Sequence, residues 1–380
     1  MNCSGIDVAT GNPVSLEFDR LITKVEPCEA ADGRYVAPGF IDIQVNGYFG
    51  VDYNNPATPH SEIARSIQAL LKTGLTRFFP TVITGSPDNM LGAIRNLRQA
   101  KQKIDEGTVI EGIHVEGPYI GPEDGPRGAH PRQWVRPPDL DEWARWRDAA
   151  EGLIRLVTLS PHWPEAPRYI EALVADSVTV SIGHTMASTE QLDDAVRAGA
   201  TLSTHLGNGA HQILRRHPNY IWDQMADDRL NADFIVDGIH LQSAFLKVAL
   251  RAKTVERSIL VTDASAPAGA AVGRYQLGEQ AVDHTADGRV VLAGTDKLAG
   301  SALRMDHGVE NLMRLAGISL RDSIQLATTN PARVTNIPKR QTGLAPGERA
   351  DVIVFGYNQE TGKIAIEQTY VDGVKMWAAN

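Results

Sequence analysis

The feature that most constrains this fold is a regular alternation of apolar runs and amphipathic stretches between residues 40 and 336. Eight β-rich runs recur and predict strands at 40–47, 77–83, 109–118, 153–161, 178–184, 200–208, 231–241 and 258–266. Apolar residues at helical spacing predict helices at 61–73, 89–104, 167–175, 190–198, 244–252, 302–315 and 321–327. Eight strands alternating with helices are typical of an α/β protein with a (β/α)8 TIM-type barrel. A doubly wound open sheet is the alternative, but the sequence has neither a Gly-x-Gly-x-x-Gly turn nor a Walker loop.

Both ends of the chain have a different, β-rich pattern. Short strands are predicted at 14–18 and 21–25, and again at 350–355, 363–371 and 374–377. Asp372-Gly373 between the last two is a type I′ hairpin signal. Because two short strands alone are only marginally stable, we expect the two ends to share one small β-sandwich. The predicted domains are therefore residues 1–39 with 337–380, and a catalytic barrel of residues 40–336.

Composition argues against several classes of function. The net charge is -9, with no long run of one sign, which argues against a nucleic-acid surface. Two cysteines provide neither a disulfide framework nor a Cys-rich zinc finger. No apolar run approaches membrane-spanning length, and the first 13 residues lack a signal-peptide pattern. We therefore expect a cytoplasmic enzyme that binds neither nucleic acid nor membrane.

Three predicted strands end on residue types that bind metals. Glu116 ends an apolar strand that Gly117-Pro118 stops, and His184 and His205 end two later strands. A carboxylate at the end of a buried strand requires a metal, a cation or donor hydrogen bonds. One carboxylate and two imidazoles are a three-ligand zinc set that leaves one position for water, whose pKa zinc lowers to about 7. For either histidine alone, a hydrogen-bonded core residue is an equal alternative.

Further polar residues at the same strand ends are candidates for catalysis and substrate binding. Asp263, at the end of the eighth strand, is the candidate general base and acid, although Asp is also a common cap. His240 is a candidate for contacting substrate or stabilising a developing oxyanion, or it lies outside the site. His130 falls in a predicted loop over the barrel mouth, where substrate contact and a plain loop position are equal alternatives.

Together these segments resemble the amidohydrolase superfamily and, within it, the N-acetylglucosamine-6-phosphate deacetylase family. The resemblance follows the chain in order over nearly its whole length. Its main segments are Ala37-Pro38-Gly39-Phe40-Ile41-Asp42, His114-Val115-Glu116-Gly117-Pro118, Gly183-His184-Thr185, Thr204-His205-Leu206, Asp237-Gly238-Ile239-His240, Val261-Thr262-Asp263-Ala264, Leu298-Ala299-Gly300-Ser301-Ala302-Leu303 and Asn330-Pro331-Ala332-Arg333.

The resemblance implies a metal-dependent deacetylase that hydrolyses the N-acetyl amide of N-acetylglucosamine 6-phosphate to glucosamine 6-phosphate and acetate. It makes Asp263 the catalytic acid–base and assigns three metal ligands, Glu116, His184 and His205. Many amidohydrolases carry His-x-His on strand one and bind two metals, but here that place holds Gln44 and Asn46. Because amides are poor zinc ligands, we expect one divalent metal per chain, Zn2+ first, with Fe2+, Co2+ or Mn2+ as alternatives.

The resemblance also implies substrate contacts and a homodimer. Asn208 and the backbone of Gly209 would hold the sugar phosphate, and His240 would contact the sugar or the acetyl carbonyl. Family dimers use an arginine of this region in the neighbouring subunit's site, so Arg216 or Arg215 is a candidate phosphate ligand. A solvated surface pair is the alternative for these two arginines.

The segment after His205 departs from the family pattern. The family usually continues with an aromatic residue and Asn-Ala-Met, whereas this chain has Gly207-Asn208-Gly209-Ala210-His211, followed by a bulkier and more basic stretch. The change lies beside the substrate rather than the metal. The alternatives are therefore the same hydrolysis on N-acetylgalactosamine 6-phosphate, an unphosphorylated N-acetyl sugar or another N-acyl compound. A catalytically silent sugar-phosphate binder is an alternative of a different class.

Overall fold

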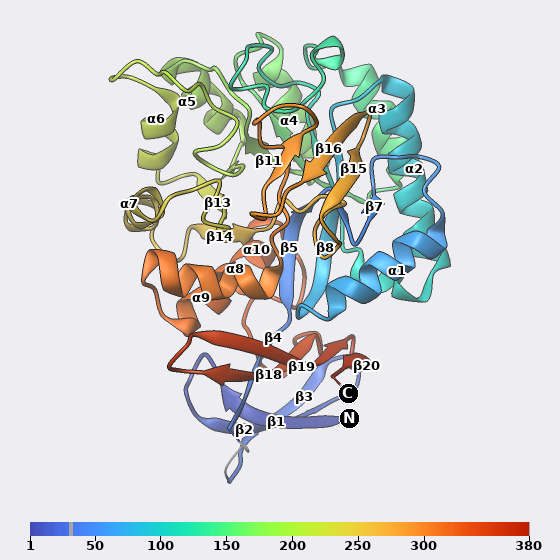
Figure 1. Ribbon diagram of the computed structural model, residues 1–380, viewed down its shortest axis with the longest axis vertical. Helices are drawn as coiled ribbons and strands as arrows, with labels where there is room; N and C mark the ends of the chain where they lie inside the picture. The colour runs from blue at the N-terminus through green and yellow to red at the C-terminus, as the bar shows by residue number, and fades with distance from the viewer. Residues whose placement is uncertain (30–32, 380) are drawn as a thin grey trace.

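The computed structural model describes residues 1–29 and 33–379, so 30–32 and 380, which the predicted terminal domain includes, lie outside the described residues. Its centre is a barrel of eight parallel strands (Figure 1), and all eight predicted strands are confirmed. In sheet order they are β5 (Phe40–Val45), β8 (Leu75–Ile83), β9 (Ile113–Glu116), β10 (Ile154–Leu159), β11 (Thr179–Ile182), β12 (Leu202–Ser203), β13 (Asn231–Ile235) and β14 (Ser258–Val261). A parallel bridge between Val45 and Ala264 closes the barrel.

Helices surround the barrel and bury the outer faces of its strands. The predicted helices are confirmed as α1 (His60–Leu71), α2 (Pro87–Lys103), α4 (Ala166–Ala175), α5 (Thr189–Ala198), α7 (Ser243–Lys253), α8 (Met305–Asn311) with η3 (Leu312–Ala316), and α9 (Leu320–Leu326). Local capping sets their starts: Ser188 and Gln191 form a capping box at α5. Five short elements were not predicted: η1 (Asp105–Val109), η2 (Arg132–Trp134), α3 (Leu140–Ala150), α6 (Tyr220–Ala226) and α10 (Thr329–Val334). None of the helices in the described residues is long and apolar enough to cross a membrane.

Both chain ends build one seven-stranded sheet below the barrel in Figure 1. Its order is β20 (Val374–Ala378), β19 (Lys363–Val371), β18 (Val352–Asn358), β4 (Arg34–Pro38), β1 (Asn2–Asp7), β2 (Pro13–Phe18) and β3 (Ile22–Pro27). Although three strands separate β2 from β19, the rings of Phe18 and Tyr370 lie 5.2 Å apart. The sheet therefore curls over its own face and encloses a core as a sandwich does. Positive φ at Asp372 and Gly373 fits the predicted hairpin turn.

Two small antiparallel sheets were not predicted. The strands β6 (Gly47–Tyr48) and β7 (Val51–Asp52) form a hairpin after β5. The strands β15 (Gly273–Leu277), β16 (Gln280–His284) and β17 (Val290–Leu292) form a sheet inserted between β14 and α8. The inserted sheet contacts the loop after β9, because Trp134 Nε1 donates to Glu279 Oε2 at 2.7 Å. The division of the chain at residues 39/40 and 336/337 stays a prediction.

A buried ion-pair cluster joins the terminal sheet to the barrel. Asp351 directly precedes β18 and is 1% exposed. Arg77 on β8 donates its Nε and Nη2 to the two Asp351 oxygens at 2.7 and 2.8 Å, and Arg340 donates to the same carboxylate. Burial would raise the pKa of Asp351, but the charges of Arg77 and Arg340 outweigh it and hold that pKa well below its ordinary value.

The Asp351→Asn substitution tests this cluster. It leaves two buried guanidinium groups without their shared anion, so the free energy of unfolding should fall by about 3–5 kcal/mol. Urea unfolding at pH 7 measures the change. The matched control is Glu26→Gln, which breaks the surface pair of Lys24 and Glu26 (2.8 Å) and should leave stability unchanged. Equal effects of the two substitutions would contradict the assignment.

The same cluster predicts a pH dependence of stability. Because the folded-state pKa of Asp351 lies below its ordinary value of about 3.9, the carboxylate stabilises the fold fully above about pH 4. That contribution is lost as the pH falls below this value. The difference in unfolding free energy between the unsubstituted protein and Asp351→Asn should therefore stay constant from pH 7 to 5 and shrink below about pH 4. A difference that persists undiminished at pH 2.5 would count against it.

Candidate active site

A cavity of about 130 Å³ opens at the C-terminal ends of the barrel strands. Polar side chains from six of these ends or the loops after them converge here, as a barrel of this type predicts. The cavity brings together eight of the nine predicted site residues: Glu116, His130, His184, His205, Asn208, Gly209, His240 and Asp263. Arg216 is the exception. It is exposed on the loop between β12 and α6 and does not line the cavity.

Three donor atoms at the base of the cavity lie unusually close together. The Nε2 atoms of His184 and His205 lie 3.1 and 2.9 Å from Glu116 Oε1, and 3.1 Å from each other. Ligands at about 2.0–2.2 Å from a tetrahedral zinc ion are about 3.3–3.6 Å apart, so the three atoms lie slightly closer together than the ligands of a shared metal. All three residues are buried.

The tautomer of His184 supports the same interpretation. Its Nδ1 lies 2.7 Å from the carbonyl oxygen of Pro126, which can only accept, so Nδ1 carries the proton. In the neutral ring, Nε2 then presents a lone pair towards Glu116. Two facing lone pairs repel unless His184 is protonated or a cation lies between them. Burial would lower the pKa of His184, but Glu116 outweighs it and raises it. The donor set therefore fits a divalent cation.

A second, overlapping set of donors contains His130 in place of His205. The ligand atoms of Glu116, His130 and His184 lie within 4.8 Å of one another. That limit is looser than the 2.9–3.1 Å spacings that include His205. The Nδ1 atom of His130 forms a 2.8 Å hydrogen bond with Thr84. Burial lowers the pKa of His130 to about 3. We therefore favour His205 as the third ligand and regard His130 as a neutral neighbour of His184.

Backbone strain marks the functional ends of the strands. His184, His205 and Asp263 have φ values of 49°, 29° and 50°, in the left-handed region that non-glycine residues rarely adopt. Each such residue costs about 1–3 kcal/mol, and the cost is typical of functional sites. At Gly209 the constraint is space as well, because a Cβ there would lie 2.6 Å from His184 Nδ1.

Asp263 lies on the same wall of the cavity as the strand-one amides. Asn46 Nδ2 donates to Asp263 Oδ1 at 2.7 Å, and Gln44 Nε2 donates to it at 3.1 Å. Burial first, and then the negative charge of Glu116, raises the pKa of Asp263 to about 6. A carboxyl group with a pKa near the operating pH is suited both to take up a proton and to return it.

A neighbouring carboxylate, that of Asp237, fixes the orientation of the His240 ring. Its Nδ1 lies 2.6 Å from Asp237 Oδ2, and two backbone amides donate to the other Asp237 oxygen. Burial would raise the pKa of Asp237, but its hydrogen bond with His240 outweighs this and lowers it. The pair therefore fixes Nδ1–H on His240, and the ring itself lines the cavity.

Several residues that line the cavity or contact its lining had no role in the sequence analysis. Gln44 and Asn46 were considered only as poor metal ligands. Their contacts with Asp263 were not foreseen, because these contacts depend on how β5 and β14 meet. The segment Leu298-Ala299-Gly300 also lines the cavity, and its presence in the family resemblance was the available signal. Leu277 comes from the unpredicted insertion.

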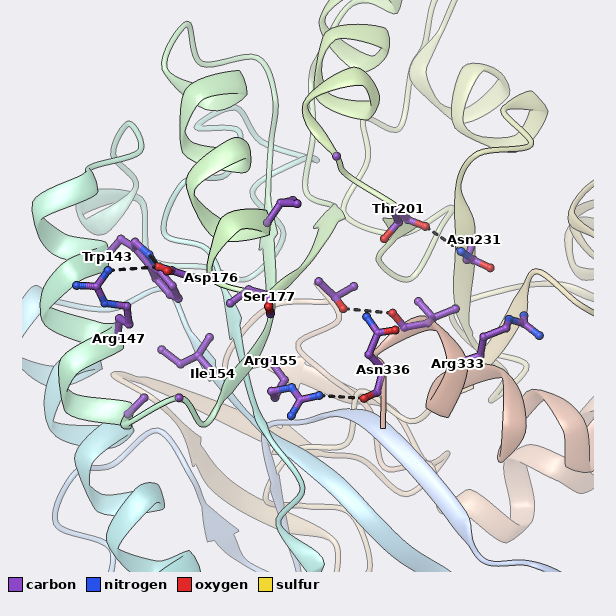
Figure 2. A pocket seen from close by; sticks show the side chains of 17 residues that line it. Trp143, Arg147, Ile154, Arg155, Asp176, Ser177, Thr201, Asn231, Arg333 and Asn336 are labelled. Carbon is purple, nitrogen blue, oxygen red and sulfur yellow. Dashed lines mark hydrogen bonds and ion pairs between the residues drawn. The ribbon is translucent and has the colours of Figure 1, made fainter. Parts of the chain in front are cut away.

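A larger groove of about 920 Å³ lies at the opposite, N-terminal end of the strands (Figure 2). Its charged side chains already have partners within the fold. Trp143 and Arg147 both donate to Asp176, and Arg155 donates to the backbone carbonyls of Thr335 and Asn336. Because the N-terminal face of such barrels serves stability, the smaller cavity is the candidate active site.

The choice of third ligand is testable by metal binding alone. His205→Ala should weaken zinc affinity by more than about 100-fold, because it removes one of three donors. His130→Ala is the matched control and should still hold one zinc ion per chain. Metal analysis after dialysis against a competing chelator measures both. Loss of zinc from His130→Ala, with retention in His205→Ala, would reverse the assignment.

Comparisons with known proteins identify the family of this chain. The amidohydrolase family matches residues 35–376. The chain is 34% identical to the N-acetylglucosamine-6-phosphate deacetylases of Bacillus subtilis (strain 168) and Homo sapiens, over 87% and 92% of this chain and 83% and 85% of theirs. A crystal structure of the Mycobacterium smegmatis N-acetyl-D-glucosamine-6-phosphate deacetylase has a TM-score of 0.89 at 30% identity and covers 99% of each chain. A mutant of that protein in complex with N-acetyl-D-glucosamine-6-phosphate has a TM-score of 0.86 at 32% identity, covering 96% of this chain and 94% of its own. The chain therefore belongs to the amidohydrolase family, among its N-acetylglucosamine-6-phosphate deacetylases.

Proposed function

We propose that this protein hydrolyses the N-acetyl amide of N-acetylglucosamine 6-phosphate and releases acetate and glucosamine 6-phosphate. The observation that carries the proposal is the convergence of Glu116, His184 and His205 within 3.1 Å of one another, in the cavity that Asp263 also lines. Amide hydrolysis needs an activated water, a polarised carbonyl and an acid for the leaving nitrogen. The family relatives named above carry the same activity in their names.

Glu116, His184 and His205 would hold one divalent cation, and zinc suits a set of two imidazoles and one carboxylate. When bound, the cation supplies Lewis acidity that polarises the amide carbonyl and acidifies a water molecule. Gln44 and Asn46 donate hydrogen bonds to the neighbouring carboxylates rather than offering a second imidazole pair. This favours a single cation per chain.

Asp263 performs both proton transfers. It first accepts a proton from the attacking water, whose oxygen forms a bond to the acetyl carbon. It then returns that proton to the amide nitrogen as the carbon–nitrogen bond breaks, so the sugar leaves as an amine and the acyl group as acetate. His240, held by Asp237, is placed to donate a hydrogen bond to the acyl oxygen or the sugar.

Within one chain, the phosphate is the part of the substrate for which the described cavity offers the weakest partners. None of the residues that line the cavity in the described structure is Lys or Arg. Asn208 and the backbone of Gly209 are neutral donors at its rim. We therefore propose a homodimer in which the exposed Arg216 of one subunit reaches the phosphate in the other, where bidentate pairing suits the anion. Because the described cavity lining has no Lys or Arg, an unphosphorylated N-acetyl sugar is the second candidate substrate.

Acetate release is the direct test. The zinc-loaded protein should release acetate from N-acetylglucosamine 6-phosphate at least about 100-fold faster, in kcat/KM, than from N-acetylglucosamine, because the phosphate adds binding energy. Similar rates on the two sugars would favour the unphosphorylated substrate. Release from neither, with one zinc ion bound per chain, would refute the proposed substrate.

Asp263→Asn should lower kcat by about 10²–10⁴-fold or more, because the amide can neither accept nor return the proton. Zinc content should stay at one per chain, since Asp263 is not one of the three donors. Asp306→Asn is a matched control at a buried carboxylate that pairs with Arg304 outside the cavity, and its kcat should not change. A near-normal rate for Asp263→Asn would show that another group moves the proton.

A further inference from the structure

Two amides at the end of strand β5 contact the carboxylates of the active site. Gln44 and Asn46 are 1% and 2% exposed. Asn46 Nδ2 lies 2.7 Å from Asp263 Oδ1, and Gln44 Nε2 lies 3.1 Å from the same oxygen. Gln44 Nε2 also lies 3.0 Å from Glu116 Oε1. One amide therefore bridges two carboxylates, and the other contacts one of them.

We propose that Gln44 and Asn46 are positioning residues that together hold Asp263 through its Oδ1, so that Oδ2 is the oxygen that takes up and returns the proton. The inference rests on the proposed role of Asp263 as acid and base. It assigns to this amide pair a function in the reaction that does not involve binding metal.

The chemistry of the groups fixes the orientation of both amides. A carboxylate oxygen only accepts hydrogen bonds, so the NH2 group of each amide must face Asp263 and its carbonyl oxygen must face away. Both N–H bonds of Gln44 can then be used, one on Asp263 and one on Glu116. Since two donors converge on Oδ1, rotation of the Asp263 carboxylate would break two charge-assisted hydrogen bonds.

The same orientation is unfavourable for the amides themselves. Gln44 Oε1 and Asn46 Oδ1 are buried and accept no hydrogen bond from the part of the chain that the structure describes. An unsatisfied buried acceptor lowers stability. A pair selected only to fill the core would be better replaced by apolar residues of similar size. The arrangement is therefore better explained by what the amides do for Asp263.

The amides stand on a rigid part of the barrel. The backbone N–H of Asn46 donates to the carbonyl of Ala264, the residue after Asp263, at 2.7 Å. The side chain of Asn54 donates to the carbonyl of Asn46 at 3.3 Å. Thr81 accepts from the backbone N–H of Val45 at 3.0 Å. The ends of β5 and β14 are thus tied together, and the distance from amide to carboxylate is set by the barrel itself.

Asn46→Ala and Gln44→Met test the inference, the second because Met keeps the length of Gln without its N–H groups. Each should lower kcat for acetate release by about 10–100-fold, with KM within about threefold and zinc at one per chain. The matched control is Asn330→Ala. Asn330 is 0% exposed and donates to the carbonyls of Val255 and Ser258 at the other end of the barrel. It should lower the melting temperature and leave kcat within about twofold.

The outcomes separate this inference from the proposed function. Acetate release by the unsubstituted protein, with kcat unchanged in Gln44→Met or in a folded Asn46→Ala, overturns the positioning role alone. A loss of kcat that follows the loss of zinc, or that Asn330→Ala shows equally, also overturns it, because the amides would then be structural. No acetate release from the unsubstituted protein overturns the proposed function, and the positioning role with it.

Discussion

The close approach of one carboxylate and two imidazoles is the constraint on which this molecule depends. Glu116, His184 and His205 hold three electron-rich atoms within 3.1 Å of one another, which is unfavourable unless a proton or a cation lies between them. The barrel gathers several strand ends at one face and so brings the three residues together. The positive φ values at both histidines add backbone strain to the unfavourable free energy of this close approach.

The acid–base group depends on the same close approach. The pKa of Asp263 is raised by burial and then by the charge of Glu116, so the candidate metal site and the proposed proton-transfer group are electrostatically linked. Gln44 is the physical connection, since its one amide donates to both carboxylates. The proposed chemistry therefore resides in a connected group of side chains from β5, β9 and the ends of β11, β12 and β14. His240 and the neutral groups of residues 208 and 209 extend it towards substrate.

Sequence patterns predicted the barrel because its evidence is local. Strands buried on both faces give short apolar runs, as in residues 259–261 of β14, and ligand-type residues at their ends stand out from such runs. The inserted sheet β15–β17 escaped prediction because four of the five residues in β15 are at least partly exposed and the strand lacks a clear apolar alternation. The role of Gln44 and Asn46 could not be predicted, because it depends on their hydrogen bonds with Asp263, which lies more than 200 residues away in sequence. For Arg216 the sequence names a candidate, but its place in a neighbouring subunit's site depends on an assembly that one chain does not define.

The terminal sheet has a consequence for how the chain is made. Strand β4 pairs with β18, so residues 34–38 meet partners 352–356, which are synthesised after all the barrel strands. Until then the N-terminal strands have an open edge and lack half of their core, a state in which chains pair with wrong partners. Such long-range pairing also slows folding. The ion-pair cluster around Asp351 forms at the same stage, so Arg77 on β8 gains this anion only after the last strand of the barrel has been synthesised.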